Sequence, residues 1–194
     1  MNIFFLDKDP VKAAKFQCDQ HIHQMPNECA RILSAVHWRN EKYNGPSKCT
    51  DGDGPYEDTD MAPDTLGPLQ WIQRSLANYR WAVRHGLALC DESQRRARAG
   101  RPPHGARKVL EWLRDHEPRT LKCGRRTPFM PATIKGHEHL FQVPGDPVAT
   151  SRKYYSFSIL TFRRREASWP PGRKPDWVRL WLNRTPHAEQ RKIL

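Results

Sequence analysis

The segment between Cys18 and His37 holds the residues best suited to chemistry. It combines carboxylates, imidazoles, thiols and a guanidinium in a stretch that otherwise has the pattern of a buried helix. A carboxylate on a buried helix face, such as Glu28, costs on the order of several kcal/mol unless it is paired, and an unpaired one is suited to general acid or base catalysis. Arg31 follows three residues later, so a structural ion pair across one helical turn is the alternative interpretation.

Three more polar side chains of this segment are candidate catalytic residues. We expect Asp19, His21 and Asn27 to orient the carboxylate or a bound base. A zinc site that includes Cys18 and His23 is the alternative, but Cys-x-x-His-x-His matches none of the common tetrahedral spacings. We therefore predict buried, hydrogen-bonded histidines and core thiols, with no metal and no cofactor.

These side chains need a helix to position them, and the apolar pattern predicts one. Apolar residues recur at three- and four-residue steps, at Ile22, Met25, Cys29, Ile32, Leu33 and Val36. Asp9 is a candidate N-cap and Pro10 suits the first helical position, so the helix should run from there to about Arg39. Pro26 interrupts the pattern and predicts either a kink or a junction of two helices.

Further along, the pattern predicts three more helices. They run from Leu69 to about Ala99, from Ala106 to His116, and from near Asp146 or Pro147 to before Pro170. Residues 3–6 predict a short buried strand, residues 44–68 a long surface loop, and residues 171–194 a basic tail. The sequence therefore predicts a mainly α, compact fold in which residues 1–194 form a single domain.

The charge of the chain is strongly positive and uneven. Its 33 Lys and Arg residues against 21 Asp and Glu residues give a formal net charge of +12. Residues 1–60 carry 7 basic and 10 acidic side chains, whereas residues 91–126 carry 11 and 5, and residues 151–194 carry 11 and 3. A basic surface favours a polyanion such as DNA, because neutralising phosphates releases condensed counterions; solubility alone is the other explanation.

Several basic and aromatic residues are candidate nucleic-acid contacts, since guanidinium groups bind phosphates and rings stack on unpaired bases. The candidates for phosphate contact are Arg31, Arg74, Arg125, Arg126 and Arg152, and those for stacking are Tyr79, Trp81 and Tyr154. A solvated charged face is the alternative for each basic run.

The remaining composition narrows the class of protein. Five cysteines, an odd number, and no secretory pattern at the start predict a reduced, cytoplasmic protein. No apolar run approaches a membrane span, so we expect no membrane contact. The chain has no glycine-rich phosphate loop, dinucleotide fingerprint or nucleophile elbow, which disfavours ATP-driven, redox and serine-hydrolase chemistry. The oligomeric state stays open.

One stretch resembles a known family. Asp19-Gln20-His21, followed by Glu28 and Arg31 and then Ala35-Val36, is similar to the phage-type pyrimidine-dimer DNA glycosylases, also called endonuclease V. The resemblance covers residues 18 to about 40.

In that family a helix of a compact helical domain carries a catalytic glutamate and arginines hold the DNA backbone. The N-terminal amine attacks the sugar carbon of a damaged nucleotide whose opposite base is flipped out. The resemblance implies Glu28 as the catalytic carboxylate and Arg31 as a phosphate or sugar contact.

Two positions differ from the pattern of that family. The chain begins Met1-Asn2 where the family has a small residue after the initiator, and Asn27 stands where the resemblance has an arginine. The nucleophile therefore stays open between an amine, a water that Glu28 activates, and a different nucleophile that acts on a base. The layout from Asp146-Pro147 to Arg152 also resembles small phage proteins whose helix begins Cys-Asp-x-His, which implies a phage-encoded protein in the host cytoplasm.

The hypothesis is a DNA glycosylase-like enzyme that acts on a flipped or modified pyrimidine in duplex DNA, with Glu28 as its catalytic carboxylate. Base flipping would let a small protein reach atoms inside the stack, at a cost of roughly a few kcal/mol that phosphate contacts offset. A transferase that modifies a pyrimidine in phage DNA is one alternative. A non-catalytic nucleic-acid-binding protein, in which Glu28 and Arg31 form only an ion pair, is the other.

Overall fold

The computed structural model describes residues 1–41, 54–56, 62–132, 138–160 and 166–178, which are mainly helical, as predicted. The helices are α1 (Pro10–Lys15), α2 (Asp19–Ile22), α3 (Met25–Glu41), α4 (Gly67–Gln73), α5 (Leu76–Arg96), α6 (Ala106–Asp115), the short 3₁₀ turn η2 (Glu138–Leu140) and α7 (Pro147–Leu160). None of these helices has the length and apolar composition needed to cross a membrane.

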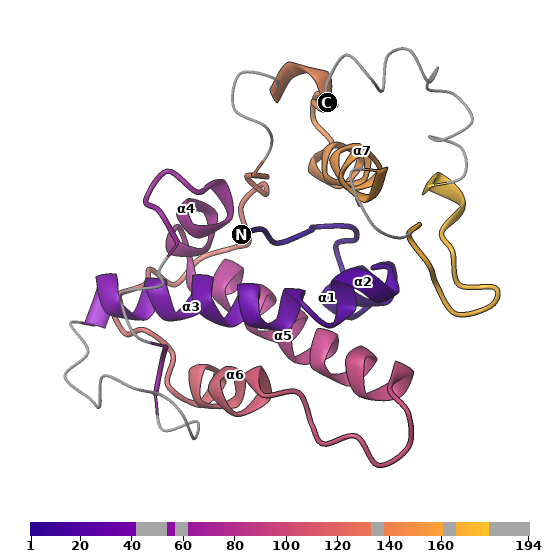
Figure 1. The fold of residues 1–194 in the computed structure, drawn as a ribbon. Coiled ribbons are helices and arrows are strands. Elements are labelled where there is room, and N and C mark those ends of the chain that lie inside the picture. Colours follow the sequence, from indigo (N-terminus) through magenta and orange to yellow (C-terminus); the bar gives the residue numbers. More distant parts are fainter. Residues whose placement is uncertain (42–53, 57–61, 133–137, 161–165, 179–194) are drawn as a thin grey trace.

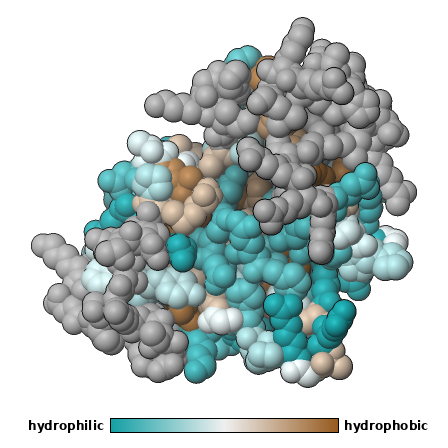
Figure 2. All heavy atoms as spheres, in the orientation of Figure 1, coloured by the Kyte–Doolittle hydropathy of each residue, from teal (hydrophilic) through white to brown (hydrophobic). Residues whose placement is uncertain are grey.

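Helix α5 is the centre of the arrangement. It packs against α1, α2, α3, α4 and α6, and Figure 1 shows it crossing behind α3. Twelve of its residues are buried, so α5 is enclosed on most of its circumference. Hydrophilic side chains cover the middle of the face in Figure 2, over α3 and α5, and apolar side chains gather near α4. The helices therefore place the first turn of α3 beside the N-terminal segment of the chain.

The predicted helix from Asp9 to Arg39 is three helices instead of one. Its start is confirmed, because the Asp9 side chain caps α1 and Pro10 is its first residue. The first break lies at Cys18, whose backbone N–H donates to the Tyr155 hydroxyl at 2.7 Å. The N–H of the following residue donates to the Ser168 carbonyl at 2.8 Å. These distant acceptors take donors that a continuous helix would use internally.

The second break agrees with the expectation for Pro26. Helix α3 begins at Met25, so Pro26 lies in its first turn, where its missing N–H leaves no helical bond unmade. Two helices therefore meet there.

The predicted strand over residues 3–6 is wrong. Residues 3–6 are buried but form no strand. The backbone N–H groups in this segment have other partners: that of Asn2 donates to Glu28, that of Ile3 to the Asn2 side chain, and that of Leu6 to the Phe4 carbonyl. Few donors remain for a β-ladder, and a ladder is what defines a strand.

The N-terminal segment instead lies beside residues 126–132, which run in the opposite direction (Figure 1). The Arg126 side chain donates to the Lys8 carbonyl at 2.8 Å, and the Asn2 amide donates to the Ala132 carbonyl at 3.2 Å. Between them the rings of Phe5 and Phe129 stack with centroids 4.9 Å apart. Pro128 and Pro131 lack a backbone N–H, which further prevents a ladder.

The other predicted elements are partly confirmed. The helix expected over residues 69–99 divides into α4 and α5, because Ser75 caps α5 by accepting the Asn78 N–H. Helices α6 and α7 lie where they were predicted. Of the predicted loop 44–68, only residues 54–56 and 62–68 are described, and of the predicted tail 171–194 only residues 171–178.

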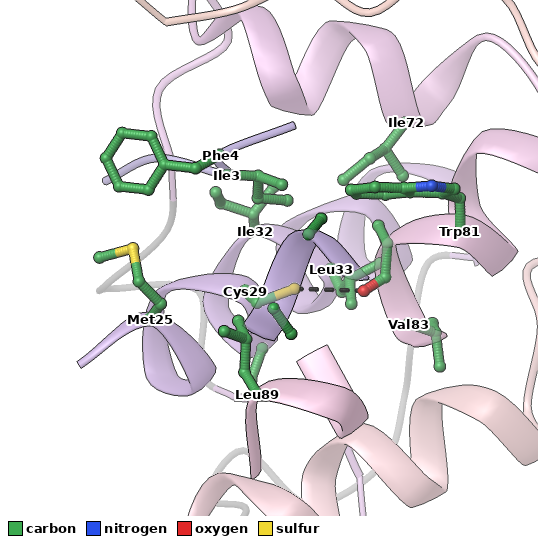
Figure 3. Packing of buried hydrophobic residues seen from close by; sticks show 14 of the residues in the cluster. Ile3, Phe4, Met25, Cys29, Ile32, Leu33, Ile72, Trp81, Val83 and Leu89 are labelled. Carbon is green, nitrogen blue, oxygen red and sulfur yellow. Dashed lines mark hydrogen bonds between the residues drawn. The ribbon is translucent and has the colours of Figure 1, made fainter. Parts of the chain in front are cut away.

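A single buried cluster joins residues from Ile3 to Val178. Figure 3 shows part of it, where the Cys29 thiol on α3 donates to the Ala82 carbonyl on α5 at 3.3 Å. Gly86 permits this close packing, because a Cβ there would lie 2.8 Å from the Leu110 side chain and 3.1 Å from the Cys29 sulfur. The core thus fixes α3 against α5 and holds the first turn of α3 in place.

Candidate active site and nucleic-acid interface

Glu28 lies in the first turn of α3, half-exposed, and both of its carboxylate oxygens accept hydrogen bonds. The backbone N–H of Asn2 donates to Oε2 at 2.7 Å, and the Gln24 side chain donates to Oε1. Among the described residues no arginine, lysine or histidine forms an ion pair with Glu28. The positive end of the α3 macrodipole also favours a negative charge in the first turn. The carboxylate is therefore oriented by neutral donors.

Asn2 is fixed on three sides. Its amide nitrogen donates to the Ala132 carbonyl and its amide oxygen accepts the N–H of Ile3 at 2.8 Å. The segment that ends at Ala132 lies directly against Gly67, where a Cβ would come within 2.8 Å of the Pro131 carbonyl oxygen. Helix α3, the N-terminal segment and residues 130–132 therefore converge at the Glu28 carboxylate.

The other candidate catalytic residues lie in different surroundings, and no described hydrogen bond joins their side chains to Glu28. His21 is buried, stacks on Phe4 with centroids 5.1 Å apart, and meets Tyr155 edge-on. Burial lowers the pKa of His21 to about 4, so its ring is neutral near pH 7. His21 is therefore a core residue that packs against Phe4 and Tyr155, and its buried ring is not placed to contact a substrate.

Asp19 and Asn27 point to two other places. The Asp19 carboxylate accepts from Arg96 at 3.1 Å and from the Ser168 hydroxyl at 2.8 Å. Asn27 is exposed and lines a cleft of about 400 Å³ together with His23 and His104. Their predicted role in orienting Glu28 stays a prediction without a supporting contact.

The cluster considered for zinc is dispersed. Cys18 is buried beside Tyr155, whereas His23 Nδ1 lies 2.8 Å from the Ser93 hydroxyl on α5. Burial, with the nearby charges of Arg101 and His104, lowers the pKa of His23. Within the described ranges, no three His, Cys, Asp or Glu side chains converge as a metal site would require.

Three of the predicted phosphate contacts lie near one another on the surface. Arg74, Arg125 and Arg126 are exposed, and the chain at Gly124 approaches Ser75 closely enough that a Cβ would lie 3.9 Å from the Ser75 side chain. The guanidinium of Arg126 lies 5.8 Å from the centroid of the Phe5 ring and is held by the Lys8 carbonyl. These cations are thus next to the N-terminal segment that reaches Glu28.

A cleft of about 600 Å³ opens beside this group. Its lining includes Phe5, Lys8, Arg126 and Phe129 on one side and Pro144 to Pro147, at the start of α7, on the other. Its lining is mostly apolar, and Lys8 and Arg126 are the cationic residues of the described lining. We call it the α7 cleft.

Two predicted stacking residues are core residues, so that prediction is corrected. Tyr79 is fully buried, its hydroxyl donates to the Leu113 carbonyl at 2.8 Å, and burial raises its pKa. Trp81 is 4% exposed and donates to the Lys8 carbonyl at 2.9 Å. Helix α5 is enclosed on most sides, so these rings pack inward and offer no face to a base.

The remaining predicted contacts are partly engaged. The Arg152 side chain donates to the Leu6 carbonyl at 2.8 Å and lies 3.6 Å from the Asp7 carboxylate. Tyr154 is half-buried against Phe141, with ring centroids 5.1 Å apart, and burial raises its pKa. Arg31 is half-buried one turn beyond the catalytic candidate on α3. Arg152 therefore acts first as a structural tie between α7 and the N-terminal segment.

Comparisons with protein-family models, curated proteins and solved structures give no match. The functional assignment of this chain therefore depends on its own geometry.

Sequence reasoning missed the two residues that contact the Glu28 carboxylate. Gln24 could have been found, because it precedes Glu28 by four residues, the spacing of neighbours on a helix face. Asn2 carries no such signal, since its contact spans 26 positions in the chain.

Proposed function

We propose that this chain is a DNA glycosylase-like, base-processing enzyme with Glu28 as its catalytic carboxylate. The substrate class is a flipped or modified pyrimidine in duplex DNA. The observation that carries the proposal is a half-exposed carboxylate in the first turn of a long helix, with a backbone nitrogen 2.7 Å from Oε2 and an amide on Oε1. No cation among the residues that the structure describes neutralises its charge, so the carboxylate remains available to a reacting centre.

Such a carboxylate has two uses in breaking the bond between a base and its sugar. As a general base it takes a proton from water while the water oxygen bonds to the sugar carbon. The bond to the base breaks, and the base leaves with its electron pair and gains a proton. The negative charge also stabilises the positive charge that develops on the sugar. Both uses need a carboxylate of fixed orientation, which Asn2 and Gln24 supply.

The nitrogen beside Glu28 is the amide nitrogen of the Met1–Asn2 peptide bond, which is not itself a nucleophile. Removal of Met1, which is 44% exposed, would convert the Asn2 nitrogen into a primary amine. That amine would bond to the sugar carbon as the base leaves, and loss of a proton and ring opening would give an imine. Borohydride reduces an imine to a stable protein–DNA adduct, so trapping separates this route from attack by water.

The basic surface supports DNA as the partner. Lys8, Arg74, Arg125 and Arg126 are exposed and lie near the N-terminal segment that leads to Glu28. An extended chain rises by about 3.3 Å per residue, so the six steps from Asn2 to Lys8 span at most roughly 20 Å. That distance corresponds to about six base-pair steps of 3.4 Å each. One duplex can therefore reach both the cations and the carboxylate.

The experiment is incubation of the purified protein with three duplex DNAs: unmodified, ultraviolet-irradiated, and containing modified pyrimidines. Nucleoside mass spectrometry and a strand-break gel give the readout. We expect abasic sites or nicks in the irradiated or modified DNA only. Intact strands with a new nucleoside mass would move the assignment to a pyrimidine-modifying transferase. DNA that binds but stays unchanged in every case would leave a binding protein and contradict the proposal.

A further inference from the structure

A third cleft, of about 700 Å³, lies at the C-terminal end of α1, whereas Lys8 precedes its N-terminal end. It is lined by the end of α1, by the end of α5 and by residues 172–177, three segments that are far apart in the sequence. Its cationic side chains are Lys15, Arg95, Arg173 and Lys174, and its aromatic ones are Phe16 and Trp177. Asp176 is the carboxylate of the described lining. We call it the α1 cleft.

The arginines of this region are assembled around one buried carboxylate. Glu92 is 1% exposed and accepts from Arg95 and Arg96, and Arg173 lies 3.7 Å away. Arg96 also donates to the Lys15 carbonyl at 3.1 Å and to Asp19. Arg95 and Arg173 nevertheless keep 47% and 48% of their side chains exposed. The cluster therefore holds guanidinium groups in fixed places at the cleft while leaving them accessible to an anion.

The aromatic wall of the cleft is also held in place. The rings of Phe16 and Trp177 meet edge-on, with centroids 6.1 Å apart, and the guanidinium of Arg152 lies 5.5 Å from one centroid and 5.4 Å from the other. The indole N–H of Trp169 donates to the Phe16 carbonyl at 2.9 Å. The indole nitrogen of Trp177 is buried and has no acceptor among the residues that the structure describes. Because that nitrogen is not accessible to solvent, contact with a ligand in the cleft falls to the exposed cationic side chains.

Exposed lysines connect this cleft with the α7 cleft. Lys8 lines the α7 cleft, Lys15 lines the α1 cleft, and Lys12 is exposed between them on α1. The carboxylates nearby have other roles: Asp9 accepts the N–H groups of Val11 and Lys12 as the helix cap. A six-residue helix is about 9 Å long at 1.5 Å per residue, so the cations follow one another at spacings that a phosphate backbone can match.

We propose that the α1 cleft binds the phosphodiester backbone of the DNA strand that flanks the processed base. This inference rests on the proposed function for the identity of the ligand. The phosphates contact Lys15, Lys174, Arg95 and Arg173, and the strand continues along α1 toward Lys8. The cleft thereby sets how far the protein extends along the DNA.

The test is DNA affinity as a function of salt for the double variant Lys15→Gln with Lys174→Gln. Losing two phosphate contacts should lower the slope of log K against log salt by roughly 1.5 to 2, because each contact in duplex DNA contributes about 0.9. The matched control removes two cations from α6, Lys108→Gln with Arg114→Gln, and should leave the slope unchanged. The charge-keeping pair Lys15→Arg with Lys174→Arg should restore it. An unchanged slope in the first variant overturns the proposal.

Two further arms separate the inference from its alternatives. Inorganic phosphate should compete with DNA only weakly, since it makes a single contact where the strand makes several. If inorganic phosphate changes the tryptophan fluorescence of the unaltered chain but not that of Trp177→Phe, and DNA changes neither, the cleft is a site for small anions and the proposal fails. The affinity of Glu28→Gln should equal that of the unaltered chain. If the unaltered chain shows no turnover but the Lys15→Gln, Lys174→Gln variant still binds DNA more weakly, the assignment of the cleft stands and the enzyme proposal fails. If the unaltered chain shows turnover but this variant binds DNA normally, only the assignment of the cleft fails.

Discussion

Glu92 and Glu28 are both acidic side chains near helix ends, yet the protein surrounds them in opposite ways. Glu92 is buried near the C-terminal end of α5, and its charge is balanced by Arg95, Arg96 and Arg173. A buried carboxylate of this kind is stable only because its cations replace the lost water. Its negative charge is therefore committed to holding the α1 cleft together.

Glu28 keeps its charge available. It is half-exposed, and the two described groups that donate to it, the Asn2 N–H and the Gln24 amide, are neutral. Neutral donors orient a carboxylate without cancelling its charge. The partners of a carboxylate, and not its burial alone, therefore decide whether it has a structural or a catalytic role.

The largest expected difference between Glu92 and Glu28 is in the free energy of unfolding. Glu92→Gln leaves the guanidinium of Arg96, which is 6% exposed, without its ion pair on α5, so we expect a loss of about 3 to 5 kcal/mol in the free energy of unfolding. Denaturant titration measures it. Glu28→Gln should change the same free energy by less than about 1 kcal/mol, because only neutral hydrogen bonds are altered. Equal losses in the two variants would show that the carboxylates do not differ.

Acid should destabilise both regions through a buried histidine in each. Burial lowers the pKa of His21, behind the Glu28 site, to about 4, and that of His85, beneath α1, to about 4. The unfolded chain binds protons on these rings below about pH 6.5 and the folded chain does not, so stability is present at pH 7 and is lost as pH falls toward 4. Between pH 7 and 5 we expect a loss of about 2 kcal/mol for each histidine.

Unfolding at a series of pH values checks this, with His21→Leu and His85→Leu as the informative variants. Each should flatten the dependence on pH between 7 and 5 by about half. A slope that neither variant changes would exclude these rings as the cause.

A smaller effect should follow when the wall of the Glu28 site is displaced. In Gly67→Ala the new Cβ would lie 2.8 Å from the Pro131 carbonyl oxygen, a backbone atom, so residues 130–132 must shift. We expect a loss of about 1 to 2 kcal/mol in stability and a roughly tenfold fall in turnover, because Ala132 holds Asn2. Gly105→Ala is the control, since nothing lies within 4 Å of its Cβ position. Matching results for both glycines would contradict this account of the wall.

The smallest expected effect comes from removing one of the neutral groups that donate to Glu28. Gln24→Ala removes the amide on Oε1 of Glu28 at an exposed position, so stability should change by less than about 0.5 kcal/mol. Turnover should fall about threefold to tenfold, since one lost hydrogen bond is worth about 1 kcal/mol. Gln70→Ala also removes an exposed amide that donates once, to the Asp64 carbonyl, and should leave turnover unchanged. A turnover equal to that of the control would exclude Gln24 as a positioning residue.

The sequence predicted the features that depend on neighbouring residues in the chain, such as helix starts and helix periodicity. The cap at Asp9, the proline that begins α1 and the position of Pro26 in the first turn of α3 follow from which backbone groups a helix end leaves unpaired. Helix α6 follows from its apolar period. The mainly helical fold could therefore be predicted.

The features that the sequence did not predict depend on tertiary contacts. The break at Cys18 depends on the hydroxyl of Tyr155, which lies 137 positions away, and the absence of a strand at residues 3–6 depends on where their N–H groups find acceptors. Tyr79 and Trp81 lie on a helix that is buried on most sides, so a periodic pattern gives no exposed face on which to place them. The residue type and position of Glu28 mark it as unusual in the sequence, but its contact with Asn2, 26 positions away, follows from no local pattern.

The measurement that tests the central claim most directly is the single-turnover rate of Glu28→Gln on the DNA that the substrate screen identifies. Glu111→Gln, a half-exposed glutamate on α6, is measured beside it as the control. We predict a fall of roughly 10² to 10⁴ in rate for Glu28→Gln, with DNA affinity and thermal stability retained, and a normal rate for the control. A Glu28→Gln protein that processes DNA at the unaltered rate would contradict the assignment of Glu28 as the catalytic carboxylate.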